Sequence, residues 1–265
     1  MKTFVTSTLA ACILSLTVGV RTASADVTER KIEYRKGDAK LIGYVYSDEK
    51  VEGNAPGVLV FSDWMGVGPF AKERAKQLVG LGYRAFVADI YGDEKLATDT
   101  KEAGELAGKF KADRKLMRAR AQAALETFLK TASVDPKRVG AIGFCFGGTV
   151  ALELARDGAP LAGLVSFHGG LDTPDATQGK NIKGKVLALH GADDPYVPEK
   201  DVAAFEDEMR KGGVNWELVK YGNAVHAFTN PAAGTDNSKG AAYNAQAAKR
   251  AYESMTNFFA EIFKS

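Results

Sequence analysis

The chain has 265 residues, of which 35 are basic and 33 are acidic, so its formal net charge is +2. This near balance of charge argues against electrostatically driven binding to nucleic acid or to anionic membranes. The length is that of one large globular domain that follows a short leader.

The first 25 residues have the pattern of a secretory signal peptide. Lys2 precedes an apolar segment over 9–20, which is shorter than a membrane span, and Ala23-Ser24-Ala25 supplies small residues for cleavage. We therefore expect export to the periplasm or the medium, with cleavage after Ala25. Residues 26–265 show no composition break and no internal repeat, and we expect them to form a single domain.

Cys145 is the only cysteine of the predicted mature chain, because Cys12 lies in the leader. A structural disulfide within the mature monomer is therefore excluded. Leu9-Ala-Ala-Cys12 also resembles a lipoprotein processing site, but the apolar region before it is very short, so lipidation is the less favoured alternative. A lone cysteine is ordinarily a small buried hydrophobe, and its local setting decides between that interpretation and a reactive one.

Strand and helix patterns alternate along the rest of the chain. Residues 31–35 and 41–46 alternate as a half-buried hairpin does, with a turn at 36–38. Parallel-type strands are predicted over 57–61, 84–88, 138–142, 161–167, 185–189 and 215–221. Helices are predicted over 70–81, 101–131, 147–157, 199–211 and 240–263. This alternation predicts an α/β fold with a mostly parallel central sheet, helices on both faces and an antiparallel N-terminal hairpin.

The stretch Gly143-Phe-Cys145-Phe-Gly-Gly148 lies between a predicted strand and a predicted helix. Glycines two before and two after Cys145 allow a sharp turn that lifts one side chain above the strand end. The positive end of the helix dipole favours a thiolate there, and backbone amides of the turn can hold an oxyanion. We therefore predict that Cys145 is a nucleophile.

A cysteine nucleophile needs a base, and the base needs an orienting carboxylate. His168 and His190 both end strands and are interpreted as structural, whereas His226 lies in a loop beyond the last strand and is the candidate base. Asp193 and Asp194 follow an earlier strand and compete for the role of carboxylate. Either one gives the chain order nucleophile, acid, base, which is that of α/β-hydrolases.

The chain resembles the dienelactone hydrolase family of α/β-hydrolases, which uses a Cys-Asp-His triad. The resemblance spans about residues 32–263. It is carried by the Cys145 elbow, by Gly191-Ala-Asp-Asp-Pro-Tyr-Val-Pro198, by His226-Ala-Phe228 and by Phe61-Ser-Asp-Trp-Met-Gly-Val67. The fold and the hydrolysis of esters or lactones are therefore what this resemblance implies.

The resemblance also assigns roles to particular residues. The family aspartate precedes x-x-Val-Pro, which selects Asp194 over Asp193 as the partner of His226. The family oxyanion hole uses two backbone amides, and the matching positions are Phe146 and Trp64.

The chain departs from the founding lactonase of the family at three positions. That lactonase has a glutamate that contacts the resting cysteine, whereas this chain has the shorter Asp63. It binds its substrate carboxylate with two arginines, where this chain has Asp93 and Asn230. The loss of both cations disfavours an anionic substrate, so we expect a neutral ester or lactone.

Aromatic residues near the motifs predict a mainly apolar pocket. The candidates are Trp64, Phe70, Tyr91, Phe144, Tyr196 and Phe228.

We predict no cofactor and no metal. No Gly-x-Gly-x-x-Gly follows the first parallel strand, and one cysteine with three scattered histidines shows no ligand spacing. The predicted partner is a small-molecule substrate, and a monomer is expected. Two other functions are alternatives: a non-catalytic binding module on the same scaffold, and thiol redox chemistry at Cys145, against which the absence of a resolving cysteine counts.

Overall fold

The computed structural model describes residues 26–264, so the predicted leader lies outside the described residues. Its strands are Val27–Lys36 (β1), Ala39–Asp48 (β2), Ala55–Phe61 (β3), Arg84–Ala88 (β4), Val134–Phe144 (β5), Gly163–Phe167 (β6), Lys185–Gly191 (β7) and Trp216–Tyr221 (β8). They form one sheet in the order β1-β2-β4-β3-β5-β6-β7-β8. The hairpin strands β1 and β2 pair antiparallel, β2 also pairs antiparallel with β4, and the other neighbours are parallel. The predicted fold class is confirmed.

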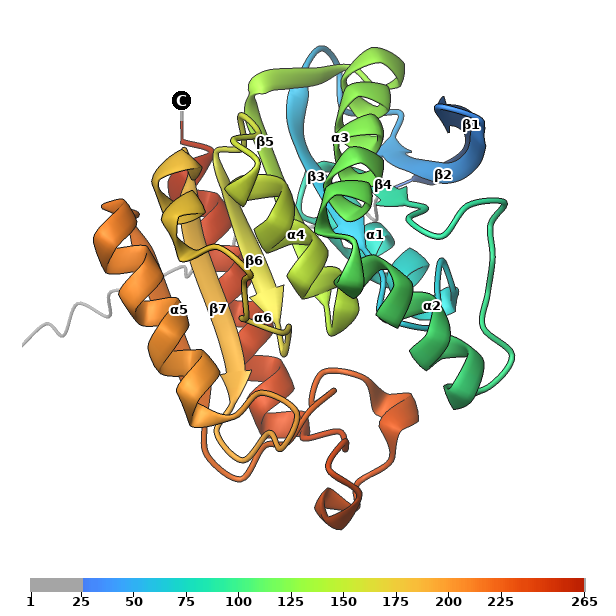
Figure 1. The fold of residues 1–265 in the computed structure, drawn as a ribbon. Coiled ribbons are helices and arrows are strands. Elements are labelled where there is room, and N and C mark those ends of the chain that lie inside the picture. The colour runs from blue at the N-terminus through green and yellow to red at the C-terminus, as the bar shows by residue number, and fades with distance from the viewer. Residues whose placement is uncertain (1–25, 265) are drawn as a thin grey trace, which may run out of the picture.

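Helices cover both faces of this sheet (Figure 1). They are Pro69–Gly80 (α1), Thr100–Ala112 (α2), Arg114–Thr131 (α3), Phe146–Arg156 (α4), Glu199–Gly212 (α5) and Ala245–Ile262 (α6), with short 3₁₀ turns at Ala176–Asn181 (η1), Pro231–Ala233 (η2) and Asn237–Lys239 (η3). Within residues 26–264, none of them is long and apolar enough to cross a membrane.

Strand β3 shows why the sheet is covered on both sides. Leu59 and Phe61 pack into a core with residues of α2, α3, α4 and α5, whereas Val58 and Val60 pack into a second core with residues of α1 and α6. All four side chains are fully buried. Apolar residues on both faces of a strand are typical of a parallel sheet between two helical layers.

The single helix predicted over 101–131 is wrong, because the structure has two helices there. Asp113 leaves the helical conformation, with φ −116° and ψ 80°, and its carboxylate accepts a hydrogen bond from the amide of Leu116 at 2.9 Å. An aspartate at this position caps the new helix by satisfying an otherwise free amide. The last predicted helix likewise begins later than expected, at Ala245, where the side chain of Asn244 caps it.

A buried charge cluster fastens α4 to α5. The guanidinium of Arg156 is fully buried and lies 2.6 Å from the carboxylate of Glu208 and 3.0 Å from that of Glu153. It also donates hydrogen bonds to the carbonyls of Leu171 and Asp172, in the segment that follows β6. One side chain therefore connects the two helices to each other and to the segment that follows β6.

Replacement of Arg156 by methionine should lower the free energy of unfolding by about 3–5 kcal/mol, because it leaves the buried carboxylate of Glu208 without a partner. Glu153 loses one of its partners and keeps its ion pair with Arg118. Urea unfolding measures this loss. The matched control is Arg210→Met, since Arg210 pairs with Glu206 and Asp207 on the exposed side of α5 and is 56% exposed. The control should change stability by at most about 1 kcal/mol. Equal losses in the two variants would contradict this account of the cluster.

Candidate active site

Cys145 lies at the turn between β5 and α4 in a strained backbone conformation. Its φ is 54° and its ψ is −116°, a region that residues with a Cβ rarely adopt. The amide of Cys145 donates to the carbonyl of Phe167 at 3.0 Å, and its carbonyl accepts from the amide of Gly148 at 3.0 Å. Strain of this kind persists only where the surroundings impose it, and it clusters at functional sites.

Two glycines allow the elbow to close against the end of β3. A Cβ on Gly143 would lie 1.9 Å from the carbonyl oxygen of Gly147, and a Cβ on Gly147 would lie 2.2 Å from that of Phe61. Both contacts are with backbone atoms, which cannot move aside, so residues with a Cβ are excluded at both positions. The close approach brings the loop after β3, which carries Trp64, to the N-terminus of α4.

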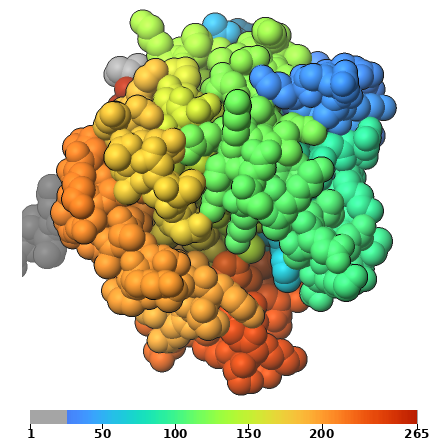
Figure 2. Space-filling view, in the orientation of Figure 1, coloured from blue at the N-terminus to red at the C-terminus, as the bar shows by residue number. Residues whose placement is uncertain are grey.

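The segment after β7 supplies the carboxylate, and the segment after β8 supplies the imidazole. The carboxyl ends of the parallel strands point to one edge of the sheet, the lower one in Figure 1, where these two segments lie together in orange and red-orange (Figure 2). Nδ1 of His226 lies 2.8 Å from Oδ2 of Asp194, and the other oxygen of Asp194 accepts from the amide of Tyr196 at 2.8 Å. Asp194 is buried, whereas Asp193 is exposed. The structure therefore pairs His226 with Asp194 and not with its neighbour.

The environment of His226 favours its charged form. Burial opposes the imidazolium, but the charge of Cys145, the hydrogen bond to Asp194 and the contact with the Cys145 side chain outweigh it and raise the pKa of His226 to about 10. A pKa of about 10 favours a protonated His226 imidazole at neutral pH.

Two free amides stand at the positions predicted for an oxyanion hole. Within residues 26–264, the backbone amides of Phe146 and Trp64 donate no hydrogen bond. Tyr91 links the two residues, because its hydroxyl donates to the carbonyl of Trp64 at 2.9 Å and its ring packs 5.4 Å from that of Phe146. The amide of Phe146 starts α4 and that of Trp64 lies in the loop after β3. Unpaired amides of this kind are suited to hold a developing negative charge.

Asp63 shapes its own loop. Its carboxylate accepts a hydrogen bond from the amide of Met65 at 2.9 Å, and within the described residues no hydrogen bond joins it to Cys145. Burial raises the pKa of Asp63, although the Met65 amide and the charge of His226 act in the opposite direction. The hydrogen bond shown for the Asp63 carboxylate is therefore local to the loop after β3.

The expectation that Phe144 and Phe228 line the pocket is wrong, because both side chains are fully buried in the core on the α1 and α6 side. Phe144 ends β5 on that face and stacks on Phe167 at 4.8 Å. The other aromatic candidates remain accessible: Trp64 is 37% and Tyr196 is 61% exposed, and Tyr91 and Phe70 are half-buried.

Neither position that corresponds to a family arginine offers a cation. Asp93 is exposed and has a φ of 51°. Asn230 uses its side-chain oxygen to cap η2, where it accepts from the amide of Ala232 at 3.0 Å. The Asn230 side chain therefore has a local role in the backbone of its loop.

Sequence reasoning missed the position of His168. Its ring lies 5.3 Å from that of His226, at an interplanar angle of 64°. Its position in the sequence indicated this proximity. His168 directly follows β6, the strand beside β5, and side chains at the ends of adjacent parallel strands converge.

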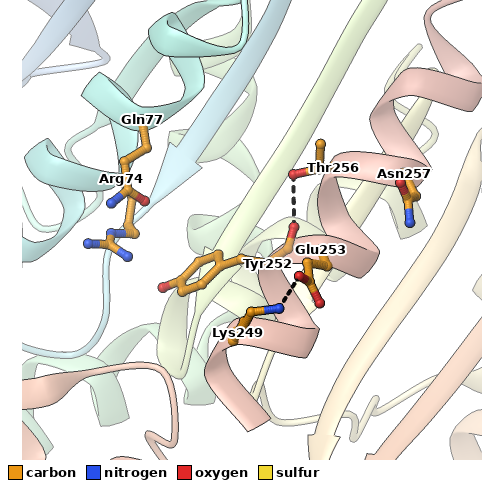
Figure 3. A pocket seen from close by; sticks show the side chains of 7 residues that line it. All are labelled: Arg74, Gln77, Lys249, Tyr252, Glu253, Thr256 and Asn257. Carbon is orange, nitrogen blue, oxygen red and sulfur yellow. Dashed lines mark hydrogen bonds and ion pairs between the residues drawn. The ribbon is translucent and has the colours of Figure 1, made fainter. Parts of the chain in front are cut away.

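A surface cavity with a volume of about 720 Å³ lies elsewhere, between α1 and α6. It is lined by Arg74, Gln77, Lys249, Tyr252, Glu253, Thr256 and Asn257, and Figure 3 shows the Tyr252 hydroxyl facing Arg74 across it. None of these residues belongs to the predicted site. Among residues 26–264, no group of three or more histidine, cysteine, aspartate or glutamate side chains is arranged to hold a metal ion.

A mostly parallel sheet with a strained strand-to-helix elbow and a histidine–aspartate pair from later strand ends defines an α/β-hydrolase. Comparison with known proteins narrows this class. A family model described as the dienelactone hydrolase family matches residues 41–263. The chain belongs to this family and is a hydrolase.

Individual relatives show how close the similarity is. The crystal structure of a dienelactone hydrolase-like promiscuous phosphotriesterase from metagenomic libraries is 43% identical, covers 90% of this chain and 99% of its own, and has a TM-score of 0.86. A chain of Aquifex aeolicus named "Putative carboxymethylenebutenolidase" is 28% identical over 88% of this chain and 98% of its own. A dienelactone hydrolase from Anabaena variabilis, 21% identical with a TM-score of 0.64 over 89% of this chain and 98% of its own, shares the fold.

Proposed function

We propose that this protein is an exported hydrolase of small neutral esters or lactones that works without a cofactor. Cys145 would be the nucleophile, His226 the acid and base, and Asp194 the group that orients His226. The observation that carries the proposal is the 2.8 Å contact between His226 and Asp194 beside a cysteine with strained backbone at a helix N-terminus.

The first half-reaction forms a thioester. The Cys145 thiolate attacks the carbonyl carbon of the substrate, and the amides of Phe146 and Trp64 hold the oxyanion that forms. As the oxyanion collapses, the bond to the leaving oxygen breaks and the His226 imidazolium gives that oxygen its proton. The alcohol leaves, or stays attached when the substrate is a lactone, and His226 is then neutral.

The second half-reaction uses the same imidazole as a base. Once the sulfur is acylated its charge is gone, so the strongest influence that raises the pKa of His226 disappears while burial still lowers it. Neutral His226 can then take a proton from water as the hydroxide attacks the thioester. The acid product leaves, and the thiolate–imidazolium pair is restored.

Neutral substrates should be preferred. Asp93 and Asn230 offer no cation for a substrate carboxylate, and half-buried Asp63 adds an acidic group near the site. We expect kcat/KM for a neutral aryl ester to exceed that of the matched ester with a carboxylate on its acyl chain by about tenfold or more, which corresponds to about 1.4 kcal/mol. Initial rates on the two esters measure this ratio. A preference for the anionic ester would contradict the substrate assignment, and no turnover beside measurable binding would favour a non-catalytic module.

Phosphotriesters are a second candidate substrate class. Their support is the similarity to the metagenomic phosphotriesterase, which covers 99% of that chain. They are also uncharged, which agrees with the lack of a cation at Asp93 and Asn230. Release of the aryl alcohol from a dialkyl aryl phosphate tests this activity.

Export belongs to the same proposal and rests on residues 1–25. Cleavage after Ala25 would give a mature chain that begins at Asp26, and N-terminal sequencing of the exported protein checks it.

A further inference from the structure

His168 is held in an unusual backbone conformation at the edge of the sheet that carries the site. Its φ is 40°, in the left-handed region, and its amide donates to the carbonyl of Leu189 at 2.8 Å. Cys145 stands at the end of the neighbouring strand with a φ of 54°. A bulky residue with positive φ is costly, and such residues persist chiefly where function requires the orientation that they give.

The ring of His168 is only 2% exposed and packs against the catalytic imidazole. Its centroid lies 5.3 Å from that of His226, 5.2 Å from that of Phe228 and 6.2 Å from that of Phe144. The ring of His226 also lies 5.4 Å from that of Tyr196, centroid to centroid. The imidazole of His226 therefore packs against two rings, and the ring of His168 is the buried one of the two.

His168 also forms a hydrogen bond with the segment that carries the base. Its Nε2 lies 2.7 Å from Oγ1 of Thr229, which is itself buried. Thr229 follows His226 by three residues, so one ring contacts this short segment at both ends. Ala227, which directly follows His226, has a φ of 56°. A strained segment of this kind needs fixed contacts to keep its conformation.

The surroundings of His168 favour the neutral form of its ring. Burial and the positive charge of His226 lower the pKa of His168 well below its ordinary value. Within residues 26–264, its Nδ1 has no hydrogen-bond partner. A neutral ring with its proton on Nε2 donates to Thr229 and leaves only a lone pair unsatisfied, whereas a charged ring would bury an unpaired N–H. His168 thus touches His226 without competing for its proton.

We propose that His168 is a positioning residue for His226. Its ring packs edge-on against the imidazole, and its hydrogen bond to Thr229 fixes the segment 226–229. Together these contacts keep His226 in the orientation that meets both Cys145 and Asp194. The inference rests on the proposed role of His226 and adds a fourth residue to the machinery that controls it.

The test compares His168→Phe, which keeps an aromatic ring, with Thr229→Val, which removes the same hydrogen bond from the other side. Each should lower kcat for a neutral aryl ester by about 10- to 100-fold, because small misplacements of a catalytic group have effects of this order. KM should change by less than about threefold. The double variant should be no slower than the slower single variant, since one bond is lost in all three.

A matched control is Thr127→Val. The hydroxyl of Thr127 donates to the carbonyl of Ala123 at 2.7 Å within α3, so this change also removes one short hydrogen bond of a half-buried threonine. We expect its kcat to equal that of the wild type. A similar loss of kcat in this control would show that the effects at 168 and 229 are general consequences of destabilisation.

A second readout does not depend on turnover. In the wild type, the Nδ1–H of His226 that is bonded to Asp194 should give a sharp far-downfield proton signal, and this signal should broaden or vanish in His168→Phe and Thr229→Val at temperatures where both are folded. An unchanged signal with unchanged kcat, or a lower Tm alone, overturns the inference. Turnover that survives replacement of Cys145 would instead overturn the proposed function and would leave this spectroscopic test intact.

Discussion

Replacement of Cys145 by alanine is expected to lower kcat for ester hydrolysis by a factor on the order of 10⁵–10⁶, the size of effect seen when a hydrolase loses its nucleophile. The remaining groups still bind substrate and hold an oxyanion, but no thioester forms. The side chain is only partly buried, so the loss of one sulfur atom should leave the fold and the Tm almost unchanged. Initial rates and a thermal unfolding curve measure both effects.

Ser166→Ala is the matched control for this variant. Ser166 lies on β6, next to the strand that leads into the elbow, and its buried hydroxyl has no hydrogen-bond partner among the described residues. Its removal therefore costs no bond, and kcat should stay within about twofold of the wild type. A Cys145→Ala protein that keeps more than about one hundredth of the wild-type rate would rule out the thiol as the nucleophile.

The second large effect is expected from Asp194→Asn, which should lower kcat by about 10⁴-fold, as the equivalent change does in a serine protease triad. A carboxamide can donate to Nδ1 of His226 and so stabilise the wrong tautomer. The change also removes the carboxylate whose hydrogen bond and charge help to raise the pKa of His226 to about 10.

The pH dependence of this variant has a definite sign. The wild-type pair is active while His226 is protonated, so kcat/KM should fall as the pH rises through about 10. Without the Asp194 carboxylate the pKa of His226 is lower, and this alkaline limb should move to lower pH. The exposed neighbour offers a control, because Asp193→Asn should change neither the rate nor the profile. An alkaline limb that does not move would contradict the role of Asp194.

Much of the fold could be predicted because the sequence pattern reports burial directly. In β3, four successive apolar residues face alternate sides of the sheet, and both sides are covered. The break at Asp113 was missed because the apolar spacing continues across it without a glycine or proline. An aspartate in mid-pattern is common on a helix surface, and only the cap that it forms with Leu116 distinguishes the two cases.

The candidate site was predictable where it depends on chain order and less so where it depends on side-chain direction. Strand ends converge on one edge, so a cysteine, an aspartate and a histidine that each follow a strand are expected to lie together. The face onto which a strand-end side chain projects depends on local φ and on neighbouring strands. For this reason Phe144 and Phe228 were misplaced, and the orientation of His168, which has a φ of 40°, could not be foreseen.

The most direct test of the central claim is peptide mass spectrometry of the mature protein after brief incubation with a slowly hydrolysed neutral ester. We predict one acyl group on the peptide that contains Cys145, its loss on longer incubation as the thioester hydrolyses, and its absence from the Cys145→Ala protein. An acyl group on another residue, or hydrolysis of the ester by the Cys145→Ala protein at the wild-type rate, would contradict the account.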